Sequence, residues 1–228
     1  MNRIIFPGAI ALAIVAGLVW WQTARPGPGL ITPAPAFASE TEAETPAEEI
    51  DTSSIVEMTL GDADAPVTVV EYASFTCPHC ANFHNDQFKR LKADYIDTGK
   101  VRFVFRDVYF DRLGLWAAMV ARCGGSDRFF GISEMLFNQQ RDWIGDGKDP
   151  VAITDRLRRI GKVAGLEEET LDACLADNDK ARTLVAWYQQ HAEADDVDST
   201  PTLVIDGQTH SNMAYDDLKD LIDEALAQ

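Results

Sequence analysis

The tetrapeptide Cys77-Pro78-His79-Cys80 has the residue types and the spacing of a redox-active dithiol. It follows the β-branched and aromatic run Val67–Ala73, which is typical of a buried strand. From Pro78 to about Lys92 the apolar residues recur at a helical spacing, and proline favours the first position of a helix. The pattern therefore predicts a dithiol at the junction between a central strand and the helix that follows it.

The two cysteines have different predicted roles. Cys77 falls at the N-cap, where the free amides and the positive end of the helix favour a thiolate over a thiol. Cys80 lies three residues further on, so it shares a helix face with Cys77 and is within disulfide reach. We expect Cys80 to be the less exposed sulfur and Cys77 to be the attacking one. A protonated His79 would stabilise the thiolate further, and a stabilised reduced form makes the disulfide a stronger oxidant.

The same tetrapeptide has two other interpretations, a buried stabilising disulfide or half of a zinc site. The sequence has no second C-x-x-C at zinc-ribbon spacing and no H-x3–5-H. Redox chemistry is therefore the favoured interpretation, and we expect no metal ligands. His84, His191 and His210 have no partner in the sequence, and we expect them to be surface or packed residues.

The remaining patterns predict an α/β chain. Strands are expected at Ile55–Leu60, Val67–Ala73, Val101–Phe105 and Thr202–Ile205. The second and third of these flank the helix after the cysteines, an arrangement that makes them a parallel pair. Four helical patterns run from about Leu113 to Ala194, separated by glycines, and a final helix is expected over Tyr215–Ala227. A helical block of about 112–195 is thus inserted into the sheet.

The first 54 residues differ from the rest. The stretch Ile4–Trp21 has no charged residue and is either a signal-peptide core or a membrane anchor. Ala36-Phe37-Ala38 resembles a cleavage site, whereas Trp20 and Trp21 suit a membrane interface and favour an uncleaved anchor. Under both interpretations the rest of the chain is exported. The third interpretation of this stretch is a buried helix of the fold. Residues 39–54 form an acidic spacer without a core, so we divide the chain into 1–38, 39–54 and 55–228.

The net charge excludes some partners. The formal charge is −17, and most of it remains without residues 1–54, which carry six acids and two arginines. Such a domain is repelled by nucleic acid and by anionic membrane surfaces, so neither is an expected partner.

Several separated features together resemble the DsbA-type thiol–disulfide oxidoreductases. They are Cys77-Pro78-His79-Cys80, Glu71 six residues before Cys77, Arg106-Asp107 with Leu113-Gly114-Leu115, and Thr200-Pro201. The resemblance extends from about residue 56 to the C-terminus. It implies a thioredoxin-like fold with a central mixed sheet and an inserted helical subdomain. It also implies that the Cys77–Cys80 disulfide acts without a cofactor.

The resemblance assigns roles to residues distant from the cysteines. A proline at a strand start is ordinarily trans, but in this family the residue matching Pro201 is cis and lies against the dithiol. The backbone of Thr200 would then bind an extended substrate segment. Glu71 would handle the proton of Cys80, the alternative being a solvent-facing carboxylate at the strand end. Threonine before the proline is frequent in isomerases of the family, while its best-known oxidases carry valine.

Cys123 and Cys174 are the other two cysteines, 51 residues apart in the helical block. An even number of cysteines in an exported chain favours pairing, and some DsbA-like proteins carry a second disulfide in this block. We expect a structural disulfide; two free thiols or a regulatory disulfide are the alternatives.

The expected function is that of a periplasmic oxidase, either soluble after cleavage near Ala38 or anchored through residues 4–21. The monomeric enzyme would donate the Cys77–Cys80 disulfide to reduced exported proteins. A DsbB-like membrane quinone oxidoreductase would restore it. The alternatives are a reductase or isomerase kept reduced by a membrane donor, which Thr200 favours, and a metal-binding module using Cys77, Cys80 and His79.

Overall fold

The computed structural model describes residues 50–228. The predicted export segment at residues 4–21, the possible cleavage site at Ala38 and most of the acidic spacer lie outside the described residues. Within residues 50–228, no helix has both the length and the apolar character needed to cross a membrane.

A five-stranded mixed sheet forms the centre of the fold, in the order β1-β3-β2-β4-β5. Strands β2 and β3 are parallel, and the other neighbouring pairs are antiparallel. The strand bounds are Met58–Leu60 (β1), Val67–Ala73 (β2), Val101–Asp107 (β3), Thr202–Ile205 (β4) and Gln208–Ser211 (β5). This arrangement confirms the predicted thioredoxin-like class. The sequence did not predict β5, which is short, polar and largely exposed at the sheet edge.

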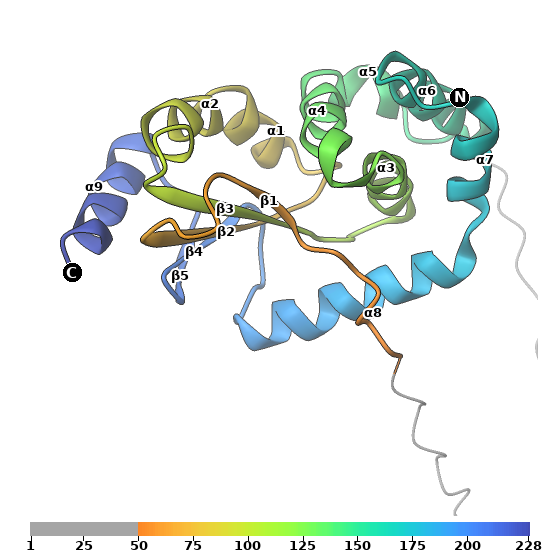
Figure 1. Cartoon of the computed structure of the whole chain (residues 1–228). Helices are drawn as coiled ribbons and strands as arrows, with labels where there is room; N and C mark the ends of the chain where they lie inside the picture. The colour runs from red at the N-terminus through yellow and green to blue at the C-terminus, as the bar shows by residue number, and fades with distance from the viewer. Residues whose placement is uncertain (1–49) are drawn as a thin grey trace, which may run out of the picture. The chain divides into compact units, whose positions relative to one another are not determined.

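The helices between β3 and β4 form the predicted insertion. Six are present rather than the four that the pattern indicated: α3 (Arg112–Cys123), α4 (Gly125–Asn138), α5 (Gln140–Ile144), α6 (Pro150–Val163), α7 (Glu168–Ala176) and α8 (Asn178–Ala194). The unpredicted breaks fall at Gln139 and at Asp177, which accepts a hydrogen bond from the Lys180 amide and so begins α8. Figure 1 shows α3–α7 grouped at one end of the sheet, with α8 running back from this group towards β4.

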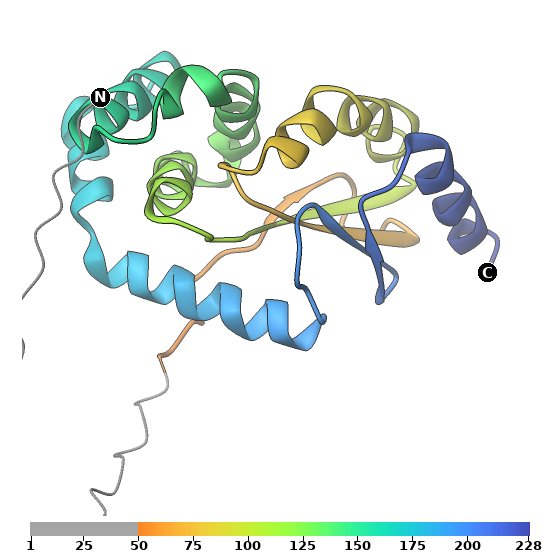
Figure 2. The ribbon, with the colours of Figure 1, turned by 180° about the vertical axis from the view of Figure 1, so that it is seen from behind.

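The helix after the dithiol is shorter than predicted. Helix α1 covers Pro78–Asn85, the backbone leaves helical geometry at Asp86, and α2 covers Gln87–Leu91 before a π-helical turn over Lys92–Ile96. The apolar spacing continues across this break, so the sequence pattern contains no signal for it. The C-terminal helix α9 (Tyr215–Leu226) packs against β2 and β4 and beside α2 (Figure 2).

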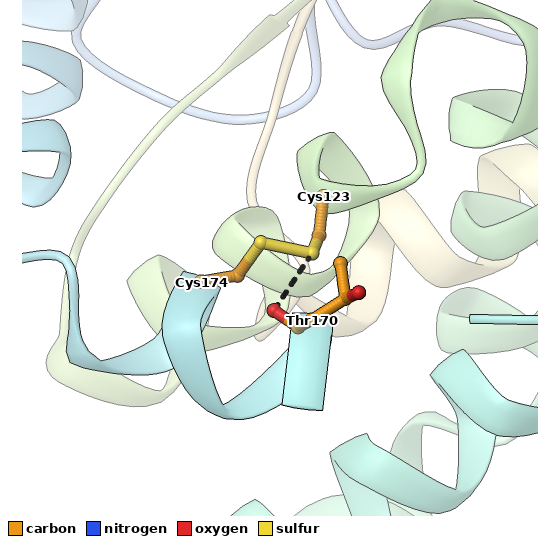
Figure 3. The surroundings of a disulfide bond; sticks show 3 residues. All are labelled: Cys123, Thr170 and Cys174. Atoms are coloured by element: carbon orange, nitrogen blue, oxygen red, sulfur yellow. Dashed lines mark hydrogen bonds between the residues drawn. A yellow bond between two sulfur atoms is a disulfide. The ribbon is translucent and has the colours of Figure 1, made fainter. Parts of the chain in front are cut away.

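A disulfide joins two helices of the insertion. Cys123, at the end of α3, is bonded to Cys174 of α7, with their Cα atoms 6.0 Å apart (Figure 3). The Thr170 carbonyl oxygen lies 3.5 Å from Cys123 Sγ. The bond closes a loop of 51 residues that contains α4, α5 and α6, so it restricts the unfolded chain strongly.

A buried ion pair connects the same helix to the sheet. Arg122, beside Cys123, binds Asp107 at the end of β3, and the two side chains are 5% and 1% exposed. Arg122 also donates to the carbonyl oxygen of Val56. The charges satisfy each other in a position where either alone would be costly.

We expect the double variant Cys123→Ala/Cys174→Ala to lose up to about 4 kcal/mol of unfolding free energy, because the unfolded chain regains loop entropy. Urea unfolding of the variant and the parent, both with the Cys77–Cys80 pair in the same redox state, measures this loss. An unchanged unfolding free energy would contradict a stabilising role for the disulfide.

Candidate active site

Cys77 and Cys80 lie at the junction of β2 and α1, where the sequence places them. Cys77 is the N-cap of α1 and Pro78 is its first residue. Both cysteines are free thiols; Cys80 is fully buried, whereas Cys77 is partly exposed. Pro78 and His79 are exposed between them. An external sulfur therefore has access to Cys77 and not to Cys80.

The two thiols have very different acidity. The pKa of Cys77 falls from 9.0 to about 5, chiefly because Cys80 donates a hydrogen bond to its sulfur. Burial opposes this change, while Thr200 and the backbone amides of Cys80 and His79 support it. Burial raises the pKa of Cys80 far above the ordinary value, and its bond to Cys77 and the charge of Glu71 add to the effect. At neutral pH Cys77 is thus a thiolate and Cys80 keeps its proton.

The peptide bond between Thr200 and Pro201 is cis and places Thr200 beside the dithiol. In the thiol form, Cys77 Sγ donates to the Thr200 carbonyl oxygen at 3.4 Å rather than capping α1. The Thr200 hydroxyl is buried and has no hydrogen-bond partner among the described residues. It is therefore available to donate to the sulfur once Cys77 has lost its proton.

The loop that carries Thr200 is tied to the sheet by a charged network. Arg106 of β3 binds Asp195, which follows α8 at the start of the loop, and Glu57 before β1. The Tyr72 hydroxyl donates to the same Asp195 carboxylate and accepts from Arg106. The Arg106-Asp107 pair of the sequence thus has two separate uses: Arg106 holds the loop, and Asp107 holds α3 through Arg122.

The loop between β2 and α1 is also held from α3. The Thr76 hydroxyl donates to Asp111, and the other carboxylate oxygen of Asp111 caps α3 at the Gly114 amide. A Cβ at Gly114 would lie 3.2 Å from Ser74 Oγ and 3.4 Å from Thr76 Oγ1. The glycine of Leu113-Gly114-Leu115 therefore permits a close approach of α3 to the dithiol loop.

Glu71 is fully buried in β2, so the solvent-facing alternative for it is wrong. Its Oε2 lies 2.8 Å from Nε2 of His84, and its Oε1 has no hydrogen-bond partner among the described residues. This partner of His84 was not predicted from the sequence. One signal was present, because His84 lies four residues after Cys80 and so faces the same side of α1.

Gln140 is a second site residue that the sequence did not reveal. Its Nε2 donates to the carbonyl oxygens of Phe75 and Cys77, both at 2.9 Å, and the residue is 7% exposed. These bonds fix the backbone on both sides of Thr76. A single glutamine 63 residues from Cys77 has no recognisable spacing, so no sequence pattern identified it.

Across residues 50–228, no group of three or more His, Cys, Asp or Glu side chains is arranged to hold a metal ion. The other predicted site residues, Cys123 and Cys174, belong to the disulfide between α3 and α7 and take no part in the dithiol site.

An acidic exposed thiol beside a buried thiol, facing a cis-proline loop on this fold, is an arrangement suited to thiol–disulfide exchange. The family model described as Thioredoxin matches residues 53–224. A putative protein-disulfide oxidoreductase of Rickettsia bellii is 33% identical over 204 residues, covering 88% of this chain and 77% of that protein. The chain spans 61% or 62% of the length of four further Rickettsia relatives.

Two further similarities specify the branch. Disulfide bond formation protein D of Bacillus subtilis is 30% identical over 175 residues, covering 73% of this chain and 76% of that protein. The crystal structure of Wolbachia pipientis alpha-DsbA1 superposes with a TM-score of 0.67 at 27% identity, covering 75% of this chain and 91% of that one. The chain therefore belongs to the DsbA-like thiol–disulfide oxidoreductases of the thioredoxin superfamily.

We expect Thr200→Val to raise the pKa of Cys77 from about 5 towards the ordinary value, because the variant keeps the branched shape and loses the hydroxyl donor. A hydrogen bond to a charged group contributes about 1.5–3 kcal/mol when buried, and less at a partly exposed sulfur. The ultraviolet absorbance of the thiolate against pH measures the change.

Thr202→Val is the matched control, since the Thr202 hydroxyl donates to Ser199 and not to sulfur. The same titration midpoint in Thr200→Val as in the parent would show that the Thr200 hydroxyl does not stabilise the thiolate.

Proposed function

We propose that this protein is an exported oxidase that donates the Cys77–Cys80 disulfide to reduced proteins. The geometry of the dithiol carries the proposal: Cys77 is the partly exposed N-cap of α1, beside buried Cys80 and 3.4 Å from the Thr200 carbonyl oxygen, and its pKa falls there to about 5. A thiolate stabilised this strongly belongs to the reduced protein and is lost on disulfide formation. Its stabilisation therefore favours the reduced enzyme and the oxidised substrate.

The proposed reaction has two exchange steps. A substrate thiolate attacks Cys77 Sγ of the oxidised enzyme, forming a mixed disulfide and releasing Cys80 as a thiolate, which takes up a proton. A second substrate thiolate then attacks the substrate sulfur of the mixed disulfide. The substrate gains a disulfide, Cys77 leaves as a thiolate, and two electrons pass to the enzyme. The acidity of Cys77 makes it the better leaving group in this second step.

The folding stability of the reduced protein should depend on pH through the charge of the Cys77 thiolate. The folded pKa of Cys77 is lowered, so its contribution to stability is fully present above the ordinary value of 9.0. The contribution declines as the pH falls and is lost below about 5. At neutral pH part of it remains, which favours a reduced enzyme after turnover.

The surface around Cys77 suits extended, unfolded substrates. Thr200 and Pro201 precede β4 directly, and the backbone of Thr200 is proposed to pair with a substrate strand beside the sulfur. Phe110 is 58% exposed and adjoins Asp111, which binds Thr76 of the dithiol loop. Main-chain pairing and a single apolar contact place few demands on substrate sequence.

The proposed location is an oxidising compartment, and the proposed reoxidant is a membrane enzyme. The apolar segment at residues 4–21 and the Cys123–Cys174 disulfide both suit an oxidising compartment outside the cytoplasm. A DsbB-like membrane quinone oxidoreductase would regenerate the Cys77–Cys80 disulfide, and no organic cofactor is needed. Treatment of intact cells with a membrane-impermeant reductant and then with a membrane-impermeant thiol reagent tests the location, because both cysteine pairs are disulfides in the proposed resting enzyme; labelling only after lysis would contradict export.

Thr200 leaves the reverse direction as a second candidate, because threonine at this position is frequent in isomerases of the family. In this structure, however, the Thr200 hydroxyl lowers the pKa of Cys77, which makes the disulfide more oxidising. The physical effect of the residue thus opposes the direction that its frequency in isomerases suggests.

The direct test uses the oxidised full chain and a reduced, unfolded model protein. We expect the parent to form substrate disulfides and Cys77→Ser to form none, since Cys80 is buried. Cys80→Ser, charged beforehand with a small disulfide on Cys77, should accumulate the mixed disulfide with a model protein that has a single cysteine, because neither Cys80 nor a second substrate thiol can resolve it. Substrate oxidation by Cys77→Ser at the parent rate would refute the proposal.

A further inference from the structure

His84 is a buried titratable residue that the exchange steps above do not use. It is 6% exposed and makes its hydrogen bond to Glu71, which is 0% exposed. Cys80 lies one helical turn before His84 on α1, and the charge of Glu71 acts on the Cys80 sulfur. The core therefore holds three adjacent groups that can gain or lose a proton: Cys80, Glu71 and His84.

The surroundings of His84 hold its ring in place. The imidazole stacks on Phe137 with ring centres 4.1 Å apart, and Phe83, Phe88 and Phe105 contact it from other sides. Aromatic faces also tolerate a cation, so this cage accommodates the imidazolium as well as the neutral ring. The cage fixes Nε2 on the carboxylate without preventing a change of charge.

His84 is also the member of the group that reaches towards solvent. It lines a cavity of about 250 Å³ between α1, α2 and α4. Apolar walls are provided by Leu60, Phe88 and Phe130, and the charged residues on the lining are Lys89, Lys92 and Glu134. These three line the cavity beside His84, and Glu71 binds its Nε2. Lys92 is already paired with Asp97, and Glu134 is exposed to water.

Thiol–disulfide exchange at Cys80 requires a path by which its proton reaches water and returns. When Cys80 resolves a mixed disulfide on Cys77, its proton must leave, and when Cys80 is released by a substrate thiolate it must gain one. Glu71 is the nearby acceptor, but as a fully buried group it has no contact with water of its own. A carboxylate in that position transfers one proton and then needs a second group to pass it on.

We propose that His84 relays the proton of Cys80 between Glu71 and the water-accessible cavity between α1, α2 and α4. This inference rests on the proposed function, since it concerns the proton of the same exchange reaction. In resolution, Cys80 gives its proton to Glu71, and the sulfur attacks Cys77 and expels the partner thiolate. Nε2–H keeps its hydrogen bond to Glu71, and because Glu71 has lost its charge the imidazolium releases its Nδ1 proton to water, so that one proton reaches water for the one taken from Cys80.

The test separates the two steps by starting from the reduced full chain and oxidised glutathione. Attack by Cys77 forms the glutathione mixed disulfide, and attack by Cys80 resolves it, so acid quenching and mass spectrometry give both rates. In His84→Gln, whose side-chain amide keeps a donor for Glu71, we expect formation at the parent rate and resolution about tenfold slower or more. The ratio of the two rates is unaffected by any loss of folded protein.

His191→Gln is the matched control. His191 also stacks on an aromatic ring, that of Trp187, and bonds to a carbonyl oxygen, but it lies on α8 away from Glu71. We expect both rates of this variant to equal those of the parent. An unchanged ratio of rates in His84→Gln, or an equal change in His191→Gln, would overturn the relay.

A second variant distinguishes proton transfer from packing. His84→Ala should resolve slowly and recover when imidazole is added, because the vacated space adjoins the cavity. Pyrazole has a similar shape and is a much weaker base, so it should not restore the rate. Equal rescue by both would show that the ring only fills space and would overturn the proposal. If the parent forms no mixed disulfide at all, the proposed function fails instead.

Discussion

The sulfur of Cys77 lies where several donors converge, and the stability of its thiolate is the constraint on which the site depends. Cys80, Thr200 and two backbone amides at the start of α1 all favour the charged sulfur. Burial removes water from one side and opposes them. Since the disulfide carries no such charge, every one of these interactions is realised only in the reduced protein, which is why they bear on the direction of exchange.

Distant parts of the chain are needed to bring those donors together. The cis-proline loop is tied by Asp195 to Arg106 and Tyr72, so β2 and β3 determine where Thr200 lies. The helical insertion contributes from the other side, through Gln140 on the dithiol loop and through the close approach that Gly114 permits. The insertion is therefore part of the support of the dithiol as well as an addition to the thioredoxin-like sheet.

The sequence predicted the elements that depend on local patterns. The β-branched run before Cys77 and the proline after it were sufficient for β2, for the start of α1 and for the unequal exposure of the two sulfurs. Sequence patterns did not predict the features that are determined by contacts between residues far apart in the chain. Neither the bonds of Gln140 to Phe75 and Cys77 nor the packing of His84 among phenylalanines leaves a periodic signal, and β5 is too polar to be recognised as a strand.

The equilibrium of the Cys77–Cys80 pair with glutathione tests most directly whether thiolate stabilisation makes this disulfide an oxidant, because the reduction potential sums every interaction that favours the thiolate. We predict a strongly oxidising pair, with a potential less negative than about −200 mV. A potential near about −270 mV, as in thioredoxin, would show that other interactions outweigh the stabilised Cys77 thiolate and would contradict the oxidase direction.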